Sequence, residues 1–501
     1  MKLYTAEEMS RADKGAQALG IPGGVLMERA GVAMARVALE AYAPQRALVV
    51  AGGGNNGGDG FVVARELHRA GVGVAVFPTK DGYEGDPGTN FEILRNLGVR
   101  FVGLDELEAE LRRSDLVIDA LLGTGFSGEV REREARLIER INESFVPVLA
   151  VDVPSGVDGA TGEVHGAAVQ AHVTVCAHAA KVGCVISPGR EHAGEVVAVD
   201  IGIPSEADVE PSLTWTDAES LRGKIPRTAE PAHKYSAGAL LVVAGSSRTT
   251  GAPQMVVRAA ERTGCGIVFL ATAESSAPAV DLELMEALVH GVPEDGEGYV
   301  TSAALERILQ LSERTSALAV GPGMGTGGEG RRLLEGILRE VDSPVLLDAD
   351  AITNLVETDA LAYRDAPTVI TPHAGELGRL LSAGAKEVSA RRLRCARSAA
   401  EEHGCCVLLK GSDTLVAEGG KVAVNSTGSV ALATAGTGDI LSGVIGALLS
   451  RGMNAYEAAR AGAWIHGRAA ELWLGETCWP AESLVATDLL LYLPEAVREL
   501  L

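Results

Sequence analysis

The chain has 501 residues, and 44 Lys and Arg against 67 Asp and Glu give it a formal net charge of −23. Apolar residues make up 47% of the chain, which is enough to bury proper cores and argues against intrinsic disorder. The acidic balance argues against a nucleic acid or an anionic membrane as partner, because phosphate backbones are bound by clustered Lys and Arg. At about 150 residues per domain, the length predicts two to four domains.

The N-terminal sequence MKLYTAEEMSRADK carries charges throughout, so we expect no signal peptide. No run of residues approaches the roughly 20 apolar positions that a bilayer-spanning helix needs. The seven cysteines form no C-x-x-C pair, so the sequence predicts neither a disulfide framework nor a zinc site. We therefore expect a cytoplasmic protein.

Short β-branched runs alternate with amphipathic patterns over the first 200 residues. The runs predict strands over residues 47–54, 72–78, 115–123 and 146–156, and the patterns predict helices over residues 61–71, 91–98 and 134–144. Apolar strands between amphipathic helices indicate a parallel sheet covered on both faces. With right-handed crossovers, the sequence predicts a doubly wound, Rossmann-like α/β domain of three layers.

The alternation lapses over about residues 204–236, where Pro, Ser and Glu occur without a sustained period. We place a domain boundary near residues 210–225 and expect domains of residues 1–212 and 213–501. A second alternation has predicted strands over residues 239–246, 317–325, 343–351 and 405–412. It predicts a second three-layer α/β domain, with no residue-level repeat between the halves.

A glycine-rich segment, GGGNNGGDG at residues 52–60, lies between a predicted strand and a predicted helix. Glycines let the backbone approach a phosphate, and a helix N-terminus supplies free N–H groups. The segment is neither G-x-G-x-x-G nor a Walker A loop, and a tight turn is an equally frequent interpretation. Asn55, Asn56 and Asp59 favour a binding site, since amides and carboxylates bind a ribose, an amide or a cation.

Two further strand ends carry polar side chains. Asp119 ends a strand just before Gly123-Thr124-Gly125, and Asp152 ends the next one, followed by Ser155. A single strand-end Asp is more often a helix cap than a catalyst. Ligands of open parallel sheets, however, lie beyond the carboxyl ends of the strands. Three such turns together therefore favour a functional site.

In the second half, GTGD at residues 436–439 opens an apolar helix. Consecutive N–H groups at a helix start can form an anion hole, and Asp439 would lie beside the bound phosphate. That arrangement suits phosphoryl transfer, although a helix N-cap is the alternative interpretation of the tetrapeptide alone. KGSDT at residues 410–414 and TPHAGE at residues 371–376, which contains His373, favour the site. His466 lies on an apolar helix and is expected in a core or an interface.

In this order, these strings resemble the bifunctional NAD(P)HX repair enzymes, in which an epimerase domain is fused to an ADP-dependent dehydratase domain. The resemblance covers nearly the whole chain and also includes LMERAG, DALLGTGFSG and AVDVPSGVDGATGEV in the first half, and HKYSAGALLVVAGS, GPGMG, LLDADAIT, NSTGS and HGRAAE in the second. It implies that the first domain interconverts the R and S forms of NADH or NADPH hydrated at C6. It also implies a ribokinase-like second domain that dehydrates the S form, converting ADP into AMP and phosphate.

The resemblance also implies site residues. In the epimerase domain the hydrate would contact Asn55, Asn56, Gly57, Gly58, Asp59, Gly123, Thr124, Gly125, Phe126, Ser127, Gly128, Glu129 and Asp152. A potassium ion would be bound by Asn56, Asp119 and Ser155. In the dehydratase domain the hydrate would contact Ala252, Gly323, His373 and Asp439. The adenine nucleotide, with magnesium, would contact Lys410, Gly411, Ser412, Asp413, Thr414 and Gly438.

Asp152 and Asp439 are the catalytic candidates, as proton-transfer groups of the epimerase and the dehydratase respectively. The resemblance further implies a homotetramer or a larger homo-oligomer. The alternative hypothesis is a ribokinase-like small-molecule kinase with a non-catalytic N-terminal binding domain. It shares the GTGD segment but leaves the first 200 residues unexplained, whereas Asn56, Asp119, Asp152 and Ser155 together favour catalysis there.

Overall fold

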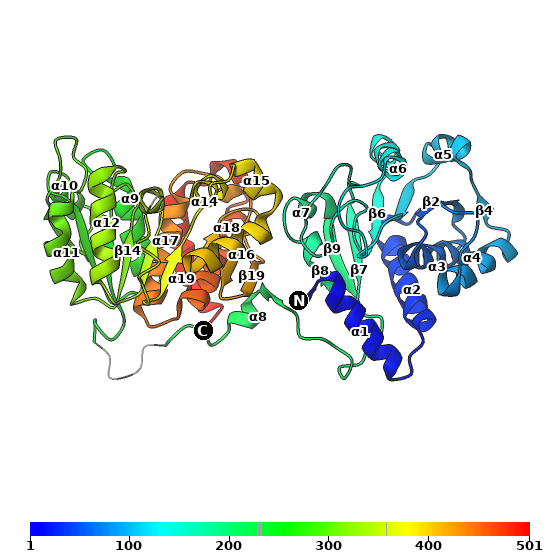
Figure 1. Ribbon diagram of the computed structural model, residues 1–501, viewed down its shortest axis with the longest axis horizontal. Helices are drawn as coiled ribbons and strands as arrows, with labels where there is room; N and C mark the ends of the chain where they lie inside the picture. Colours follow the sequence, from blue (N-terminus) through cyan, green and yellow to red (C-terminus); the bar gives the residue numbers. More distant parts are fainter. Residues whose placement is uncertain (228–229, 231–232, 357) are drawn as a thin grey trace. The chain divides into compact units, whose positions relative to one another are not determined.

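The computed structural model describes residues 1–501 except residues 228–229, 231–232 and 357 (Figure 1). The chain forms two compact units, Met1–Thr214 and Trp215–Leu501, which divide inside strand β10 (Leu213–Thr216). Within the predicted irregular segment 204–236, residues 228–229 and 231–232 lie outside the described residues. Both units have the predicted α/β class, with mainly parallel sheets.

The main sheet of the first unit is parallel throughout, in the order β4-β3-β2-β5-β6-β7-β9. Its strands are β2 (Arg46–Ala51), β3 (Gly73–Pro78), β4 (Arg100–Phe101), β5 (Leu116–Ala120), β6 (Val148–Val151), β7 (Val173–Ala177) and β9 (Glu195–Val199). A short strand β8 (Ala180–Lys181) pairs with β1 (Leu3–Tyr4), which also pairs with β10. The carboxyl ends of β2, β5, β6 and β7 are therefore neighbours.

Helices cover both faces of this sheet. They are α1 (Ala6–Ala18), α2 (Gly23–Tyr42), α3 (Asn55–Arg69), α4 (Gly85–Asn96), α5 (Leu104–Leu111), α6 (Glu132–Glu143), the 3₁₀ helix η1 (Val182–Cys184) and α7 (Gly189–Ala193). Side chains alternate along the strands, so Val49 lies in the core filled by α1 to α4, while Leu48 lies in the core filled by α5 and α6.

The sheet of the second unit has the order β13-β12-β11-β14-β15-β16-β17-β18-β19. Its strands are β11 (Ala239–Val243), β12 (Ile267–Ala273), β13 (Leu288–Val292), β14 (Ala317–Val320), β15 (Val345–Leu347), β16 (Thr368–Ile370), β17 (Cys406–Leu409), β18 (Leu415–Glu418) and β19 (Lys421–Asn425). Pairing is parallel as far as β17, and β18 and β19 continue antiparallel. Neighbouring carboxyl ends again meet at one edge.

The helices of the second unit are α8 (Ala218–Leu221), α9 (Gly251–Arg262), α10 (Ala277–Asp281), α11 (Leu305–Ser312), α12 (Gly328–Glu340), α13 (Asp350–Leu355), α14 (Ala374–Leu380), α15 (Ala385–Ala390), α16 (Arg392–His403), α17 (Thr437–Ser450), α18 (Ala455–Thr477) and α19 (Leu489–Arg498). Its 3₁₀ helices are η2 (Ser302–Ala304), η3 (Val430–Leu432), η4 (Ala481–Ser483) and η5 (Ala486–Asp488). Helix α17 is buried on nearly every side, and one hydrophobic core unites it with α9, α18 and α19. This packing fixes the helix that begins at the GTGD segment.

Helix α3 differs from the prediction, because it begins at Asn55 and not near residue 61. The turn after β2 is thus only residues 52–54, and the polar part of the glycine-rich segment forms the first turns of the helix. The glycines lowered the helix propensity of these positions. They are needed for packing, since a Cβ on Gly57 would lie 2.0 Å from the carbonyl oxygen of Gly52.

The close approach of α17 to α9 predicts opposite effects for two glycine substitutions. A Cβ at Gly443 would lie 2.2 Å from the carbonyl oxygen of Val256. A Cβ at Gly475 on α18 would have no atom of another residue within 4 Å. We expect Gly443→Ala to lower the free energy of unfolding by about 1–3 kcal/mol, and Gly475→Ala to raise it by up to about 1 kcal/mol. Urea unfolding followed by tryptophan fluorescence reports on this unit, which holds all four tryptophans. Equal effects of the two changes would contradict the packing argument.

Candidate functional site

A cavity of about 850 Å³ opens at the carboxyl ends of β2, β5 and β6 in the first unit. Of the predicted epimerase residues, those that line it are Asn55, Asn56, Asp59, Gly123, Thr124, Gly125, Phe126, Ser127, Glu129 and Asp152. Gly57, Gly58 and Gly128 are not among its lining residues. Gly58 packs against α2 instead, because its Cβ would lie 2.6 Å from Cε of Met27.

Asp119 is the centre of a buried hydrogen-bond cluster beside this cavity. Its Oδ1 accepts from Oγ of Ser155 at 2.6 Å, and its Oδ2 accepts from the Ser155 N–H at 2.8 Å. Nδ2 of Asn56 donates to the Leu122 carbonyl at 2.9 Å, and the Leu122 N–H donates to Oγ of Ser155 at 2.8 Å. The structure thus brings together Asn56 on α3, Asp119 at the end of β5 and Ser155 after β6.

The donor set of this cluster suits a hard cation. It comprises carboxylate, hydroxyl, amide and carbonyl oxygens, which are the ligands that hard cations prefer. Asp119 is fully buried and forms no ion pair within the described residues, and burial raises its pKa to about 6. A bound cation would compensate this buried carboxylate, so the residues fit a potassium ion.

Asp152 follows β6 in a backbone conformation that is unusual for a residue with a side chain, with φ of 69°. Its Oδ1 accepts from the Ala177 N–H at 3.0 Å and from Nζ of Lys181 at 2.7 Å. The Lys181 side chain is completely buried, and that of Asp152 is 13% exposed. An ion pair therefore holds the predicted catalytic carboxylate at the wall of the cavity.

Among the other carboxyl groups that line the same cavity are Asp13 on α1 and Asp59 on α3. Burial, followed by the charges of Asp152 and Asp13, raises the pKa of Asp59 well above its ordinary value. Burial and the charge of Asp152 likewise raise the pKa of Asp13. The cavity wall consequently holds a paired carboxylate next to carboxyl groups that retain their protons more strongly.

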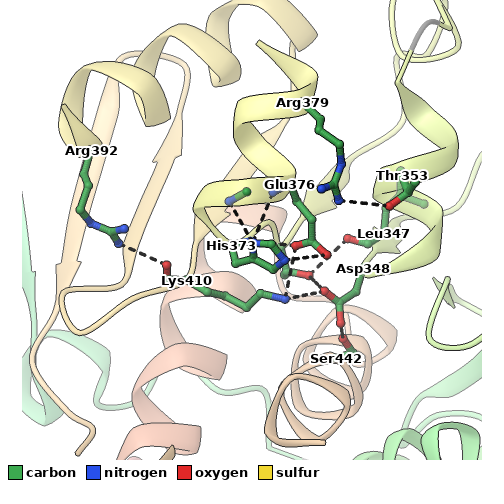
Figure 2. Close-up of polar contacts among 11 residues, drawn as sticks. Leu347, Asp348, Thr353, His373, Glu376, Arg379, Arg392, Lys410 and Ser442 are labelled. Carbon is green, nitrogen blue, oxygen red and sulfur yellow. Dashed lines mark hydrogen bonds and ion pairs between the residues drawn. The ribbon is translucent and has the colours of Figure 1, made fainter. Parts of the chain in front are cut away.

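In the second unit, the carboxylate of Asp348 connects the ends of β15, β16 and β17 with helix α17 by hydrogen bonds. Asp348 follows β15, and its Oδ1 accepts from Nζ of Lys410 and from Oγ1 of Thr371, both at 2.8 Å (Figure 2). Its Oδ2 accepts from Oγ of Ser442 on α17 at 2.8 Å. Burial lowers the pKa of Lys410, but the carboxylates of Asp348 and Glu376 raise it by more. A charged ammonium is thus fixed at the carboxyl end of β17.

The GTGD turn lies beside this ammonium. Gly436 has φ of 91°, which favours glycine, and α17 starts with no side-chain cap. A Cβ on Gly438 would be 3.7 Å from Nζ of Lys410. Burial and the charge of Asp348 raise the pKa of Asp439 to about 6, while Lys410 opposes that shift. Free N–H groups, an ammonium and a basic carboxylate are together here, as an anion-binding site requires.

His373 is exposed and caps α14, where its Nδ1 accepts from the Gly375 N–H at 2.9 Å (Figure 2). Glu376 completes this capping box by accepting from the His373 N–H at 2.8 Å. Nε2 of His373 lies 3.5 Å from the Glu376 carboxylate. The ring is thereby held at the same sheet edge as Lys410.

The predicted nucleotide segment, residues 410–414, forms a turn closed between Gly411 and Thr414. The side chain of Asp413 is buried, and Nε of Arg392 lies 2.9 Å from its Oδ1. Nη2 of the same arginine donates to the carbonyl oxygens of Leu409 and Lys410 at 3.3 Å. Asp413 consequently supports the turn through Arg392, and a nucleotide would contact the backbone of the turn and not the Asp413 side chain.

Of the two small predicted residues, Gly323 lies in the loop after β14, and Ala252 lies in helix α9, which follows the loop after β11. Gly323 has φ of 67°, and its Cβ would be 2.5 Å from Cγ2 of Thr249, just before α9. Ala252 lies in the first turn of α9 and is buried. The backbones of these loops also join, because the Gly245 N–H donates to the Pro322 carbonyl at 2.8 Å. Both residues are therefore at the carboxyl edge of the sheet.

Three polar residues of these sites escaped the sequence analysis. Asp348 ends a predicted strand just as Asp119 and Asp152 do, so the same signal could have revealed it. Lys181 is a single charge within the apolar run AHAAKVGCV, which is a weaker signal. Asp13 carries no comparable signal, because it lies within helix α1 and not at the end of a strand.

Family models match both units: the model described as YjeF-related protein N-terminus matches residues 23–183, and that described as NAD(P)H-hydrate dehydratase matches residues 240–494. The chain is 37% identical to the bifunctional NAD(P)H-hydrate repair enzyme of Thermofilum pendens, covering all of this chain and 97% of that relative. It is 38% identical to the enzyme of that name from Salinibacter ruber, and the match covers 99% of this chain and 96% of that relative.

A crystal structure of the ADP/ATP-dependent NAD(P)H-hydrate dehydratase from Bacillus subtilis, co-crystallised with ATP and Mg²⁺, is similar in fold. Its sequence is 28% identical to this chain, and the TM-score is 0.51. The match covers 57% of this chain and 99% of the Bacillus subtilis chain. The kinase alternative leaves the first unit unexplained, whereas the relatives match along the whole length. The chain belongs to the family of bifunctional NAD(P)H-hydrate repair enzymes.

Proposed function

We propose that the first unit interconverts the R and S hydrates of NADH and NADPH, and that the second dehydrates the S hydrate while ADP becomes AMP and phosphate. The observation that carries this proposal is the presence, in a full-length member of the family, of two separate polar sites at sheet edges. One holds a carboxylate paired with a lysine beside a carboxyl group of raised pKa, and the other combines an anion site with a basic carboxylate.

The epimerase step needs a proton acceptor for the C6 hydroxyl group and a proton donor for ring N1. C6 of the hydrate carries a hydroxyl group and ring N1, so it is a hemiaminal carbon. Asp152 would take the hydroxyl proton while the C6–N1 bond breaks and its electron pair moves to N1. Asp59, which keeps its proton more strongly, would protonate N1. The resulting C6 aldehyde can then be attacked by N1 from either face, which gives both epimers.

The remaining predicted residues would bind and orient the hydrate in this cavity. The potassium ion would be bound by Asn56, Asp119 and Ser155, and it would supply positive charge near the polar part of the substrate. Those residues join the start of α3 to the segments at the ends of β5 and β6 by direct hydrogen bonds. They consequently keep the segment of residues 123–129 in place against the cavity.

In the dehydratase step, Asp439 would deprotonate the C6 hydroxyl, whose oxygen attacks the β-phosphorus of ADP and displaces AMP. The C6–O bond then breaks as the N1 lone pair forms a C6–N1 double bond, and phosphate leaves. Loss of a proton from C5 gives the dihydronicotinamide. Lys410 and the N–H groups at the start of α17 would stabilise phosphate charge, while Ala252, Gly323 and His373 contact the hydrate.

Magnesium would reach this site with the nucleotide, whose phosphates supply several of its ligands. In the part of the chain that the structure describes, no group of three or more His, Cys, Asp or Glu side chains could hold a metal ion. The same residues include no helix long and apolar enough to cross a membrane. The homotetramer or larger assembly and the cytoplasmic location stay predictions from the resemblance and the sequence.

Absorbance at 340 nm tests both activities in one sample. With a mixture of R and S NADHX, ADP and Mg²⁺, we expect complete recovery of NADH, and none when the nucleotide is omitted. The rate of spontaneous epimerisation, measured in a sample without enzyme, is subtracted. Recovery that stops at the S fraction would contradict the epimerase assignment, and no recovery with ADP or ATP would contradict the dehydratase assignment.

The raised pKa of Asp439 predicts a pH dependence for the dehydratase step. A general base must be ionised, so the turnover of S-NADHX should rise with pH, with a midpoint near the pKa of about 6. Asp439→Asn should lower turnover by about 10²–10⁴-fold and abolish this rise. The exposed Asp365→Asn serves as the matched control. Normal turnover in a folded Asp439→Asn protein would exclude this residue as the base.

A further inference from the structure

Lys181 is an ammonium group buried without contact with solvent in the first unit. Its Nζ donates to Oδ1 of Asp152 at 2.7 Å and to the carbonyl oxygens of Ala177 and Ala179, both at 2.9 Å. All three ammonium hydrogens thus have an acceptor. Burying an ion costs several kcal/mol, and ion pairs in protein interiors often contribute little net stability. Stability alone is therefore a poor reason for this lysine.

The geometry assigns different tasks to the two oxygens of Asp152. Oδ1 accepts both Lys181 and the Ala177 N–H. No hydrogen bond to Oδ2 is formed within the described residues, and the side chain keeps 13% exposure at the cavity wall. Holding Oδ1 therefore leaves Oδ2 for the substrate. The ion pair also holds Asp152 in a backbone conformation, with φ of 69°, that is unusual for a residue with a side chain.

Ionisable groups face this ion pair from each neighbouring element. They are Asp13 on α1, Asp59 on α3, Cys176 on β7 and Cys184 on η1. Sγ of Cys176 donates to the main-chain carbonyl of Asp152 at 3.2 Å, so this thiol does not touch the carboxylate. Of the three carboxyl groups, Asp152 is the one in contact with a cation in the described part of the chain.

We propose that Lys181 is a positioning residue of the epimerase: it orients Asp152 and makes Asp152, instead of Asp13 or Asp59, the carboxylate that accepts the substrate proton. The inference rests on the proposed epimerase function. An opposite charge favours the ionised form of the nearest carboxyl group, and that ionised group then disfavours ionisation of its neighbours. One lysine would in this way determine both the proton acceptor and the proton donor.

The test is a double-mutant cycle of Lys181→Met and Asp152→Asn in the full chain. Met has a similar length without the charge, so Lys181→Met should lower the kcat for R-to-S conversion by about 10²-fold with little change in KM. The acidic limb of the kcat/KM profile should move to higher pH, because the variant lacks the positive charge that contacts the Asp152 carboxylate. Adding Asp152→Asn should then cost far less than it does in the wild-type chain.

Glu110→Gln is the matched control, since it removes another buried charge of the same unit. Glu110 is 2% exposed, and its carboxylate lies 3.1 Å from Arg46 and 3.0 Å from Arg100. We expect this variant to lose stability but to keep the wild-type kcat and pH profile. If circular dichroism shows that Lys181→Met does not fold, the pH profile is measured with Lys181→Gln, which retains two N–H donors.

A folded Lys181 variant with wild-type kcat and pH profile would overturn the inference, as would additive losses in the cycle. These outcomes differ from failure of the proposed function, in which the wild-type chain itself would not convert R-NADHX to S-NADHX. Loss of activity in Glu110→Gln equal to that in Lys181→Met would also overturn it, because the loss would then follow from weakened folding.

Discussion

A lysine ammonium paired with a carboxylate at the carboxyl edge of a parallel sheet is the interaction on which each site depends. Lys181 binds Asp152 in the first unit, and Lys410 binds Asp348 in the second. Burial strengthens such attraction but makes every unpaired charge costly. Each ion pair therefore fixes the charge distribution of its site before any substrate binds.

The two units use their ion pairs differently. In the first, Lys181 holds the candidate proton acceptor itself, and the pKa values of the neighbouring Asp13 and Asp59 are raised by burial and by the charge of Asp152. In the second, Asp348 holds Lys410 beside the start of α17, and its negative charge helps to make the nearby Asp439 more basic. The same physical rule, that a charge disfavours a like charge close by, raises the pKa of Asp59 in one site and that of Asp439 in the other.

Much of this could be predicted from the sequence. Alternating apolar runs and amphipathic patterns depend on local period, so they predict parallel α/β units. The positions of Asp119, Asp152 and Asp439 could be predicted because a polar residue at the carboxyl end of a strand, directly after it or at a helix start lies at the edge of the sheet. The start of α3 at Asn55 was not predicted, since glycine has low helix propensity and its packing role is a property of the fold.

The sequence by itself determined the two-unit α/β plan, the family and the positions of the polar turns, because these depend on order and spacing along the chain. Only the tertiary structure decided which charges are paired. It joined Lys181 to Asp152 and brought Asp13 from α1 to the same cavity. It also turned Asp413 inward to Arg392. Electrostatic energies depend on distance and burial in space, and neither quantity is encoded in the separation of residues along the sequence.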